Sequence, residues 1–203
     1  MTTPTQLEIE CALISGAADD ETRGTFNKFP VPAGYTLYDR RNLDGGFDVD
    51  SYKNGNTIVI AFAPTNAKEW CDIFTDVVLG LGGADKQLMQ AAEYYMYIKS
   101  LPENEGAEII FTGHSLGGGL AALMAVFFDK NAVAFDQAPF ERAANLDVAV
   151  ALKNYLINAF PANTYPQISD WLAPLNSYIN SYGDLFSSRE NNVTNINVLY
   201  VMK

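Results

Sequence analysis

The chain has 203 residues, of which 48% are hydrophobic and 18% charged, so it carries enough apolar material for one domain and is not a disordered polymer. Its 24 acidic and 13 basic residues give a net charge of -11, which repels phosphate groups and argues against nucleic acid as a partner. No apolar stretch approaches the roughly 20 residues of a membrane-spanning helix, and the start shows no signal peptide. We therefore expect a soluble chain and leave its compartment open.

The first part of the chain predicts a helix, an irregular segment and a β-hairpin. Apolar residues at helical spacing predict a helix over 7–18, and a stretch rich in Gly, Pro, Asn and Asp predicts irregular structure over 24–44. An Asn-Gly pair at 54–55 between two apolar runs is typical of a hairpin, with strands over 47–52 and 57–63. The second strand is apolar throughout, as expected of a strand covered on both faces.

The middle of the chain alternates between the two kinds of element. Helical spacing recurs over 85–100 and 116–128, and short apolar runs predict strands over 108–112 and 132–135. Strands that alternate with helices predict a parallel sheet with helices on its faces.

The segment 141–184 interrupts this alternation. It predicts two helices, over 147–159 and 167–180, and it is too apolar for a solvated loop. Two interpretations stay open: a helical cap or lid that encloses an acyl-binding pocket, or ordinary packing onto the sheet. A last apolar run predicts one more strand over 195–202.

The most specific motif is a Gly-x-Ser-x-Gly pattern formed by Gly113, Ser115 and Gly117. It lies between a predicted strand and a predicted helix, as a nucleophile elbow requires. The glycines let the chain pass through a sharp turn that exposes the serine hydroxyl above the end of the sheet. The turn also places the Leu116 N–H at a helix N-terminus, where it would stabilise an oxyanion. The alternative is a glycine-rich turn that only permits close packing of helix and sheet.

These residues resemble the class 3 (fungal-type) lipases of the α/β-hydrolase superfamily. The elbow at 113–121 reads Gly-His-Ser-Leu-Gly-Gly-Gly-Leu-Ala, as in that family, and the strand at 58–65 with the acidic, Trp-containing segment at 69–76 is similar to a second family motif. The resemblance covers about residues 45–140. It implies a three-layer α/β-hydrolase core in which 141–184 is the cap or lid insert.

The resemblance also implies a function and site residues. Ser115 would attack the carboxylic ester of a lipid and form an acyl-enzyme, as in a lipase, an esterase or a phospholipase. The amides of Leu116 and Thr65 would form the oxyanion hole, although Ala63 and Pro64 stand where the family has Arg-Gly. The chemistry needs no cofactor and no metal.

A serine hydrolase also needs a base and an acid, and the sequence offers few candidates. The chain's one histidine, His114, directly precedes Ser115 and is expected to pack below the turn. Asp136 and Asp184 are candidates for the acid. In the family the acid and the base follow later strands, so we expect residues 1–203 to be the N-terminal portion of a hydrolase domain truncated at its C-terminal end.

Three further expectations follow. The alternative to an enzyme is a catalytically incomplete hydrolase-like domain used for binding or assembly, which would associate with the C-terminal remainder of the protein or with a second copy of itself. The carboxylates over 44–50 lack the spacing of an EF-hand, so a solvated strand explains them and no metal site is predicted. Cys11 and Cys71 are expected to be plain buried thiols.

Overall fold

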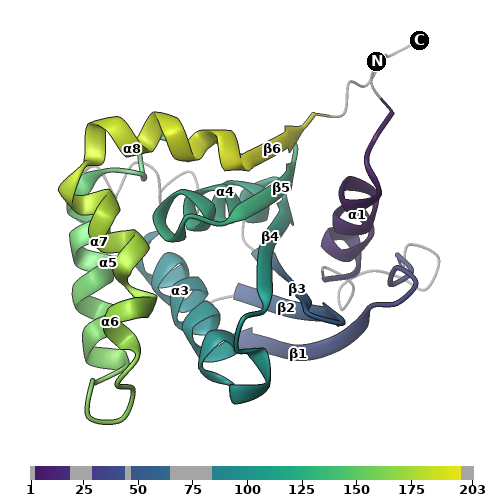
Figure 1. Ribbon diagram of the computed structural model, residues 1–203. Coiled ribbons are helices and arrows are strands. Elements are labelled where there is room, and N and C mark those ends of the chain that lie inside the picture. Colours follow the sequence, from purple (N-terminus) through teal and green to yellow (C-terminus); the bar gives the residue numbers. More distant parts are fainter. Residues whose placement is uncertain (1–2, 19–28, 44–46, 65–83, 198–203) are drawn as a thin grey trace.

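The computed structural model describes residues 3–18, 29–43, 47–64 and 84–197, and the statements below concern these residues. Their strands form one six-stranded sheet with helices on both faces (Figure 1). The strands are β1 (Thr36–Leu43), β2 (Phe47–Asn54), β3 (Thr57–Pro64), β4 (Glu108–His114), β5 (Asn131–Phe135) and β6 (Val193–Ile196). The helices are α1 (Gln6–Ala18), α3 (Ala84–Ser100), α4 (Leu116–Phe128), α5 (Leu146–Ala159), α6 (Ile168–Trp171), α7 (Ala173–Asn180) and α8 (Tyr182–Arg189), with short 3-10 turns η3 (Pro102–Asn104) and η4 (Glu190–Asn192).

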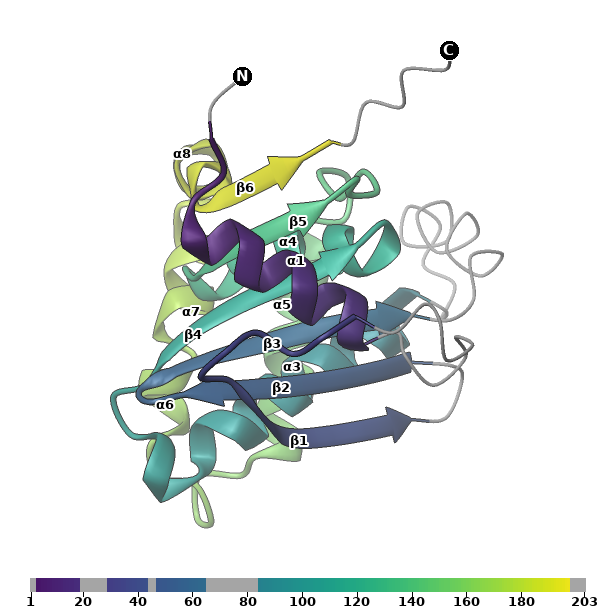
Figure 2. The same ribbon diagram turned by 90° about the vertical axis from the view of Figure 1, so that its right-hand side faces the viewer.

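The sheet follows the order of the chain, from β1 at one side to β6 at the other. The first three strands are antiparallel, and β3 to β6 are parallel (Figure 2). The predicted hairpin is confirmed, because Gly55 at φ 57 turns the chain between β2 and β3. We call the side of the sheet where β3 to β6 end its carboxyl end, and the side where they begin its amino end.

The apolar sequence of β3 is explained by two cores. Ile58 and Ile60 belong to the cluster beneath α3 and α4, while Val59 and Ala61 belong to the cluster beneath α1. Figures 1 and 2 show α1 on one face of the sheet and the other described helices on the opposite face. The predicted mixed α/β architecture and the strand covered on both faces are therefore confirmed.

One strand was not predicted. Residues 36–43 lie in the stretch expected to be irregular, yet they form β1 along β2. The sequence of β1 is polar because β1 lies at the edge of the described sheet, where its side chains reach solvent. Several of its contacts with neighbouring elements are made by charged side chains. The Arg41 guanidinium, for example, lies 3.8 Å from the centre of the Tyr97 ring.

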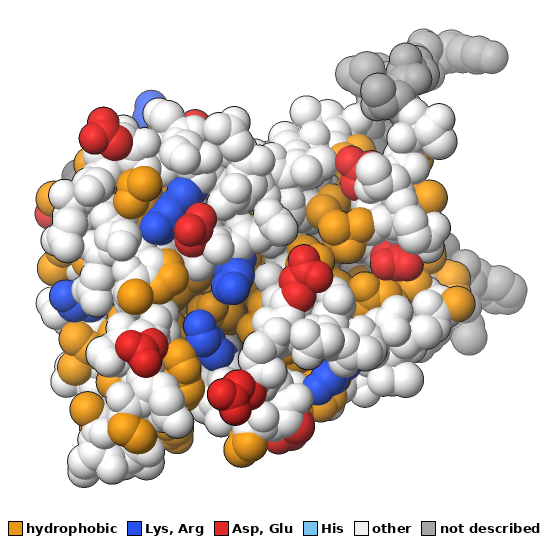
Figure 3. Space-filling model, viewed as in Figure 1, with side chains coloured by type: hydrophobic (Ala, Val, Ile, Leu, Met, Phe, Trp, Pro, Cys, Tyr) orange, Lys and Arg blue, Asp and Glu red, His pale blue; other side chains and the backbone are white. Residues whose placement is uncertain are grey.

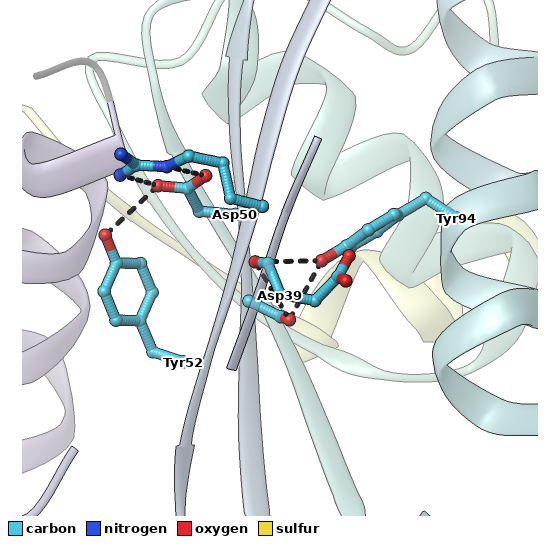
Figure 4. A network of polar contacts seen from close by, with 6 residues as sticks. Asp39, Asp50, Tyr52 and Tyr94 are labelled. Atoms are coloured by element: carbon cyan, nitrogen blue, oxygen red, sulfur yellow. Dashed lines mark hydrogen bonds and ion pairs between the residues drawn. The ribbon is translucent and has the colours of Figure 1, made fainter. Parts of the chain in front are cut away.

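Buried polar groups fix β2 in the middle of this antiparallel region (Figure 4). Arg40 donates to the two carboxylate oxygens of Asp50 at 2.8 and 2.6 Å, and the Tyr52 hydroxyl donates to the same carboxylate at 3.2 Å. Burial and the Asp50 charge raise the pKa of Tyr52 to about 12, so this hydroxyl remains a donor. Asp50 is only 2% exposed, so the expectation of a solvated strand over 44–50 is wrong at this residue. Its charge is paired instead.

On the other face of the strand, the Tyr94 hydroxyl lies 2.9 Å from Ser51 Oγ and 3.3 Å from the Asp39 carbonyl oxygen. This contact ties α3 to both β1 and β2.

The insert 141–184 packs as an outer helical layer. Leu152, Leu156, Leu175 and Tyr178 are fully buried and belong to the same cluster as α3 and α4. Figure 1 shows α5, α6 and α7 on the far side of α3 and α4 from the sheet. These contacts are those of ordinary packing. Closure over a substrate stays a prediction.

The predicted helix over 167–180 is divided in two. α6 ends at Trp171 and α7 begins at Ala173, because Pro174 in the first turn of α7 has no N–H and cannot continue the preceding helix. The next helix, α8, was not predicted separately. The last strand begins earlier than predicted, at Val193, and 198–202 lie outside the described residues. None of the helices described here is long and apolar enough to cross a bilayer.

Candidate active site

Ser115 occupies the turn between β4 and α4 at the carboxyl end of the sheet. Its φ of 53° and ψ of -112° place a non-glycine residue in a costly region of backbone space. A serine before a helix usually adopts an extended conformation and caps the helix through its side chain, whereas Ser115 makes no such hydrogen bond. The half-buried hydroxyl is therefore not used to cap α4.

The glycines around Ser115 are required by close backbone contacts. A Cβ atom on Gly113 would lie 2.3 Å from the carbonyl carbon of Gly117, and one on Gly119 would lie 2.7 Å from the Ala138 carbonyl oxygen. Both distances are too short for any side chain, and the neighbours are backbone atoms that cannot rotate away. The steric explanation predicted for Gly113 is thus confirmed.

The segment after β5 supports the turn, a role that sequence reasoning missed. The Ser115 N–H donates to the Phe135 carbonyl at 2.8 Å, and the Ala138 N–H donates to the Ser115 carbonyl at 2.9 Å. Gly119 also packs on Ala138, as described above. Gly118 and Gly119, which the Gly-x-Ser-x-Gly motif does not require, leave room for this segment at Gln137 and Ala138.

The oxyanion-hole candidates are placed only in part. Leu116 is the first residue of α4, so its N–H is among the first groups of the helix, which have no intrahelical acceptor. Thr65 lies outside the described residues, as does the segment 69–76. β3 leads toward Thr65 and pairs with β4 so that Phe62 lies opposite Gly113. The two strands therefore end side by side.

His114 does not pack below the turn, contrary to expectation. Its side chain is 61% exposed, and its Nε2 lies 3.7 Å from Oδ2 of Asp136, itself at a φ of 44°. The imidazole is therefore directed to solvent and toward Asp136 and not into the core. The structure thus brings His114, Ser115 and Asp136 to one end of the sheet. Asp184 is not among them, because it lies in the first turn of α8, at the amino end (Figure 2).

Other reactive groups lie apart from this turn. Cys11 lies on the buried side of α1, where burial raises the pKa of its thiol to about 12, and the expected buried thiol is confirmed at this residue. Cys71 lies outside the described residues. Within the described residues, no group of three His, Cys, Asp or Glu side chains is placed to hold a metal ion.

A serine at the turn between a parallel strand and a buried helix, at the carboxyl end of a mixed sheet, is the arrangement in which α/β hydrolases carry their nucleophile. Residues 36–154 match the Tle-like phospholipase domain, and the chain belongs to this phospholipase-like family. The wider lipase and phospholipase relationship expected from the sequence is thus confirmed, while membership of the class 3 lipases stays a prediction.

Two individual proteins are similar to the chain. An extracellular phospholipase A1 from Serratia liquefaciens is 39% identical over 93 residues, which are 46% of this chain and 28% of that protein. The match thus spans little more than a quarter of the relative's length. A crystal structure of an MDLA variant from Penicillium cyclopium superposes with a TM-score of 0.42 at 15% identity, over 75% of this chain and 70% of that one. A likeness of this size carries no argument about function.

Proposed function

We propose that this chain carries the nucleophile of a phospholipid acyl-ester hydrolase, and that Ser115 is that nucleophile. The observation that carries the proposal is the backbone of Ser115, strained at the end of a parallel strand, with a hydroxyl that does not cap the helix it precedes. Strain of this kind persists where the surrounding structure enforces it, and it concentrates at functional sites. Here glycine contacts and the segment after β5 enforce it.

The reaction would proceed in two steps. Ser115 Oγ attacks the ester carbonyl, its proton passes to a base, and the lysophospholipid leaves as an alcohol. Water then hydrolyses the acyl-enzyme, releases the fatty acid and restores the hydroxyl. The oxyanion formed in each step would lie near the Leu116 N–H and the positive end of the α4 dipole, and a single such donor contributes about 10²–10³ in rate.

Phospholipid is favoured over acylglycerol by the family and by the name of the Serratia relative. The substrate class rests on this likeness alone. The acyl position that is cleaved is therefore an outcome of the experiment below.

The base is the open element of the mechanism. His114 and Asp136 form the one imidazole–carboxylate pair in the described residues, but His114 directly precedes Ser115 and its ring points outward. Adjacent side chains in a tight turn point to different sides, so we keep the base outside these 203 residues as a prediction. For the same reason a catalytically incomplete domain, used for binding or assembly, remains the second candidate.

A lid role for 141–184 is a weaker proposal. Leu175 is fully buried in the shared core, so truncation to alanine should lower stability and affect long-chain and acetate esters equally. A selective loss of long-chain turnover in Leu175→Ala would instead support the lid interpretation.

Assembly has one structural basis. Among the described strands β6 pairs with β5 alone, so its outer side offers hydrogen-bonding groups to the remainder of the protein or to a second copy. Sedimentation of the chain across a concentration series would detect self-association. A constant monomer mass would exclude a second copy as the partner and favour the C-terminal remainder of the protein.

The direct test is covalent labelling combined with product analysis. A fluorophosphonate should label Ser115, as located by peptide mass, and hydrolysis of a phospholipid with two different acyl chains should identify which chain is released. Ser115→Ala should lose labelling and at least about 10³-fold in rate, since removal of a triad serine has effects of this size or larger. Ser188→Ala, at an exposed position of α8, is the matched control and should behave as wild type.

The outcomes separate the candidates. Labelling and hydrolysis that both depend on Ser115 support the enzyme. The absence of both in a folded chain supports the binding domain. Retention of either in Ser115→Ala would show that the assignment of the nucleophile is wrong.

A further inference from the structure

A cavity lies at the amino end of the sheet, opposite the end that carries the Ser115 turn. It has a volume of about 540 Å³ and is bounded by the last turn of α3, the η3 segment, the turn between α4 and β5, and α6. Figure 3 shows this face with a hollow that contains apolar side chains and has both basic and acidic side chains around it. This volume is within the range of small-molecule sites, which is about 300–1,000 Å³.

Two lysines line this cavity, and neither has a carboxylate partner among the residues that the structure describes. Lys99 comes from α3 and Lys130 from the turn after α4. Within the described part of the chain, neither ammonium group lies within 4.0 Å of a carboxylate oxygen, although the chain as a whole carries 24 acidic residues. One carboxylate, Glu105, does line the cavity, and a second, Asp170, acts on Lys99 through space.

The two positive charges oppose each other. Burial and, next, the charge of Lys130 lower the pKa of Lys99, while Asp170 raises it. Like charges held together in a half-buried site destabilise one another unless an anion lies between them. In a protein of net charge -11, such an arrangement is a local exception to the surface as a whole.

The remaining walls combine apolar and polar side chains, among them Asn104, Glu105 and Gln167. Tyr95 and Ile109 are 1% and 5% exposed, and Trp171 borders the cavity from α6. Asn104 is held by its own hydrogen bonds, donating to the Ile98 carbonyl at 2.8 Å and accepting from Lys53 at 2.7 Å. The cavity therefore offers apolar contact to a carbon skeleton beside two point charges.

We propose that this cavity is a binding site for a phosphate-bearing organic anion, held by Lys99 and Lys130. Lysine is a point charge suited to phosphate, whereas planar carboxylates are more often held by the fork of an arginine. The volume exceeds what a phosphate group alone would fill, and the apolar walls account for the rest. The site does not depend on the proposed hydrolase activity, because it lies at the other end of the sheet from Ser115.

The test uses glycerol 3-phosphate as the probe and isothermal titration calorimetry as the measurement. One molecule should bind per chain, with a Kd of about 1 mM or lower at low salt. Lys99→Gln/Lys130→Gln should weaken binding at least about tenfold, since each lost charge-assisted contact is worth more than that of a neutral pair. Lys86→Gln/Lys153→Gln makes the same change in net charge at positions outside the cavity and should bind as wild type.

Circular dichroism checks that each variant is folded, and Lys130→Gln alone provides a second, milder variant that should also weaken binding. No saturable binding by the wild type, or equal binding by the cavity variant and the matched control, would overturn the proposal. Loss of hydrolysis in Ser115→Ala with retained glycerol 3-phosphate binding would show that the two sites are separate.

Two further arms distinguish the source of the phosphate. Inorganic phosphate should bind more weakly than glycerol 3-phosphate, because it makes no contact with the apolar walls. Vesicles that contain phosphatidylglycerol test a membrane headgroup. Binding to vesicles that depends on Lys99 and Lys130 supports the site with a lipid as its source, and binding to the soluble probe alone supports a free metabolite.

Discussion

The two ends of α4 are fixed by different means. At its N-terminus, Ser115 has a positive φ, no side-chain cap, and hydrogen bonds through backbone groups to Phe135 and Ala138. At its C-terminus, Asp129 adopts the left-handed conformation, and the buried Arg189 donates to the carbonyls of Val126 and Phe127 at 2.9 and 3.2 Å. The first end is held by backbone contact, the second by a side chain.

This difference shows which end is available for chemistry. The last carbonyls of a helix have no intrahelical donors, and at the C-terminus of α4 a guanidinium satisfies two of them. At the N-terminus, the Ser115 side chain occupies the cap position but makes no capping hydrogen bond. The helix can be stable without this hydrogen bond because its residues are buried throughout, from Gly117 to Phe128.

The largest expected effect comes from filling the backbone contact at the N-terminus. Gly113→Ala would place a Cβ 2.3 Å from the Gly117 carbonyl carbon, so the turn must open. We expect the free energy of unfolding to fall by about 3–5 kcal/mol, as in severe overpacking, with loss of fluorophosphonate labelling at Ser115. Urea unfolding followed by circular dichroism measures the first quantity.

The matched control is Gly183→Ala in α8, where a Cβ meets nothing within 4 Å. Alanine is the better helix former, so stability should rise by about 0.5–1 kcal/mol. If Gly113→Ala had the same stability as wild type, the close approach of Gly113 to the Gly117 backbone would be contradicted.

Much of this arrangement could be predicted from the sequence, and what was missed has common physical causes. The strand, the turn and the helix at 108–128 follow from local patterns: an apolar run, small residues and helical spacing. β1 was missed because an edge strand is polar, and pairing with β2 is a tertiary contact. The support of Ser115 by Ala138 is likewise invisible to local patterns, because the two residues meet only when β4 and β5 pair.

The outward position of His114 shows the same limit at the candidate site. The motif fixes the backbone of the turn, but the space available to each side chain depends on neighbouring strands. A residue such as Asp136, identified as a candidate acid from its place after a strand, acquires its actual neighbour only in the folded sheet. The role of Arg189 could not have been predicted either, since a lone arginine in a polar segment is usually exposed.

The second effect tests the side-chain end of α4. Arg189→Met keeps the length of the side chain but removes the donors to Val126, Phe127 and Pro174. Carbonyls left without partners in a buried site should cost about 2–4 kcal/mol of stability, with labelling of Ser115 retained in the folded protein. Arg142→Met, at an exposed position, should change stability by less than about 0.5 kcal/mol.

If Arg189→Met abolished labelling without lowering stability, the two ends of α4 would not be independent. The conclusion that backbone contacts stabilise one end and a side chain the other, each without the other, would then be wrong.

A smaller effect is expected at His114. Its imidazole is exposed and directed toward Asp136, so His114→Gln should change the rate of Ser115 labelling by less than about threefold. A general base contributes about 10²–10⁴, so the two possibilities are far apart. A loss of that size, with the circular dichroism spectrum unchanged, would identify His114 as the base and place the whole proton relay within this chain.

The smallest effect lies at the C-terminal side of α4, in the Lys99–Lys130 pair. Because burial and Lys130 lower the pKa of Lys99, the folded state holds that proton less tightly than the unfolded state, and the charge destabilises the fold at neutral pH. As pH rises through the lowered pKa and then the ordinary one, this penalty disappears. Lys99→Gln should therefore raise stability slightly at pH 7, by less than about 0.5 kcal/mol, and by nothing above about pH 11. Thermal unfolding at the two pH values measures this. A Lys99→Gln variant that is less stable than wild type at pH 7 would mean that the Lys99 charge is paired in the folded protein and that the repulsion by Lys130 is outweighed.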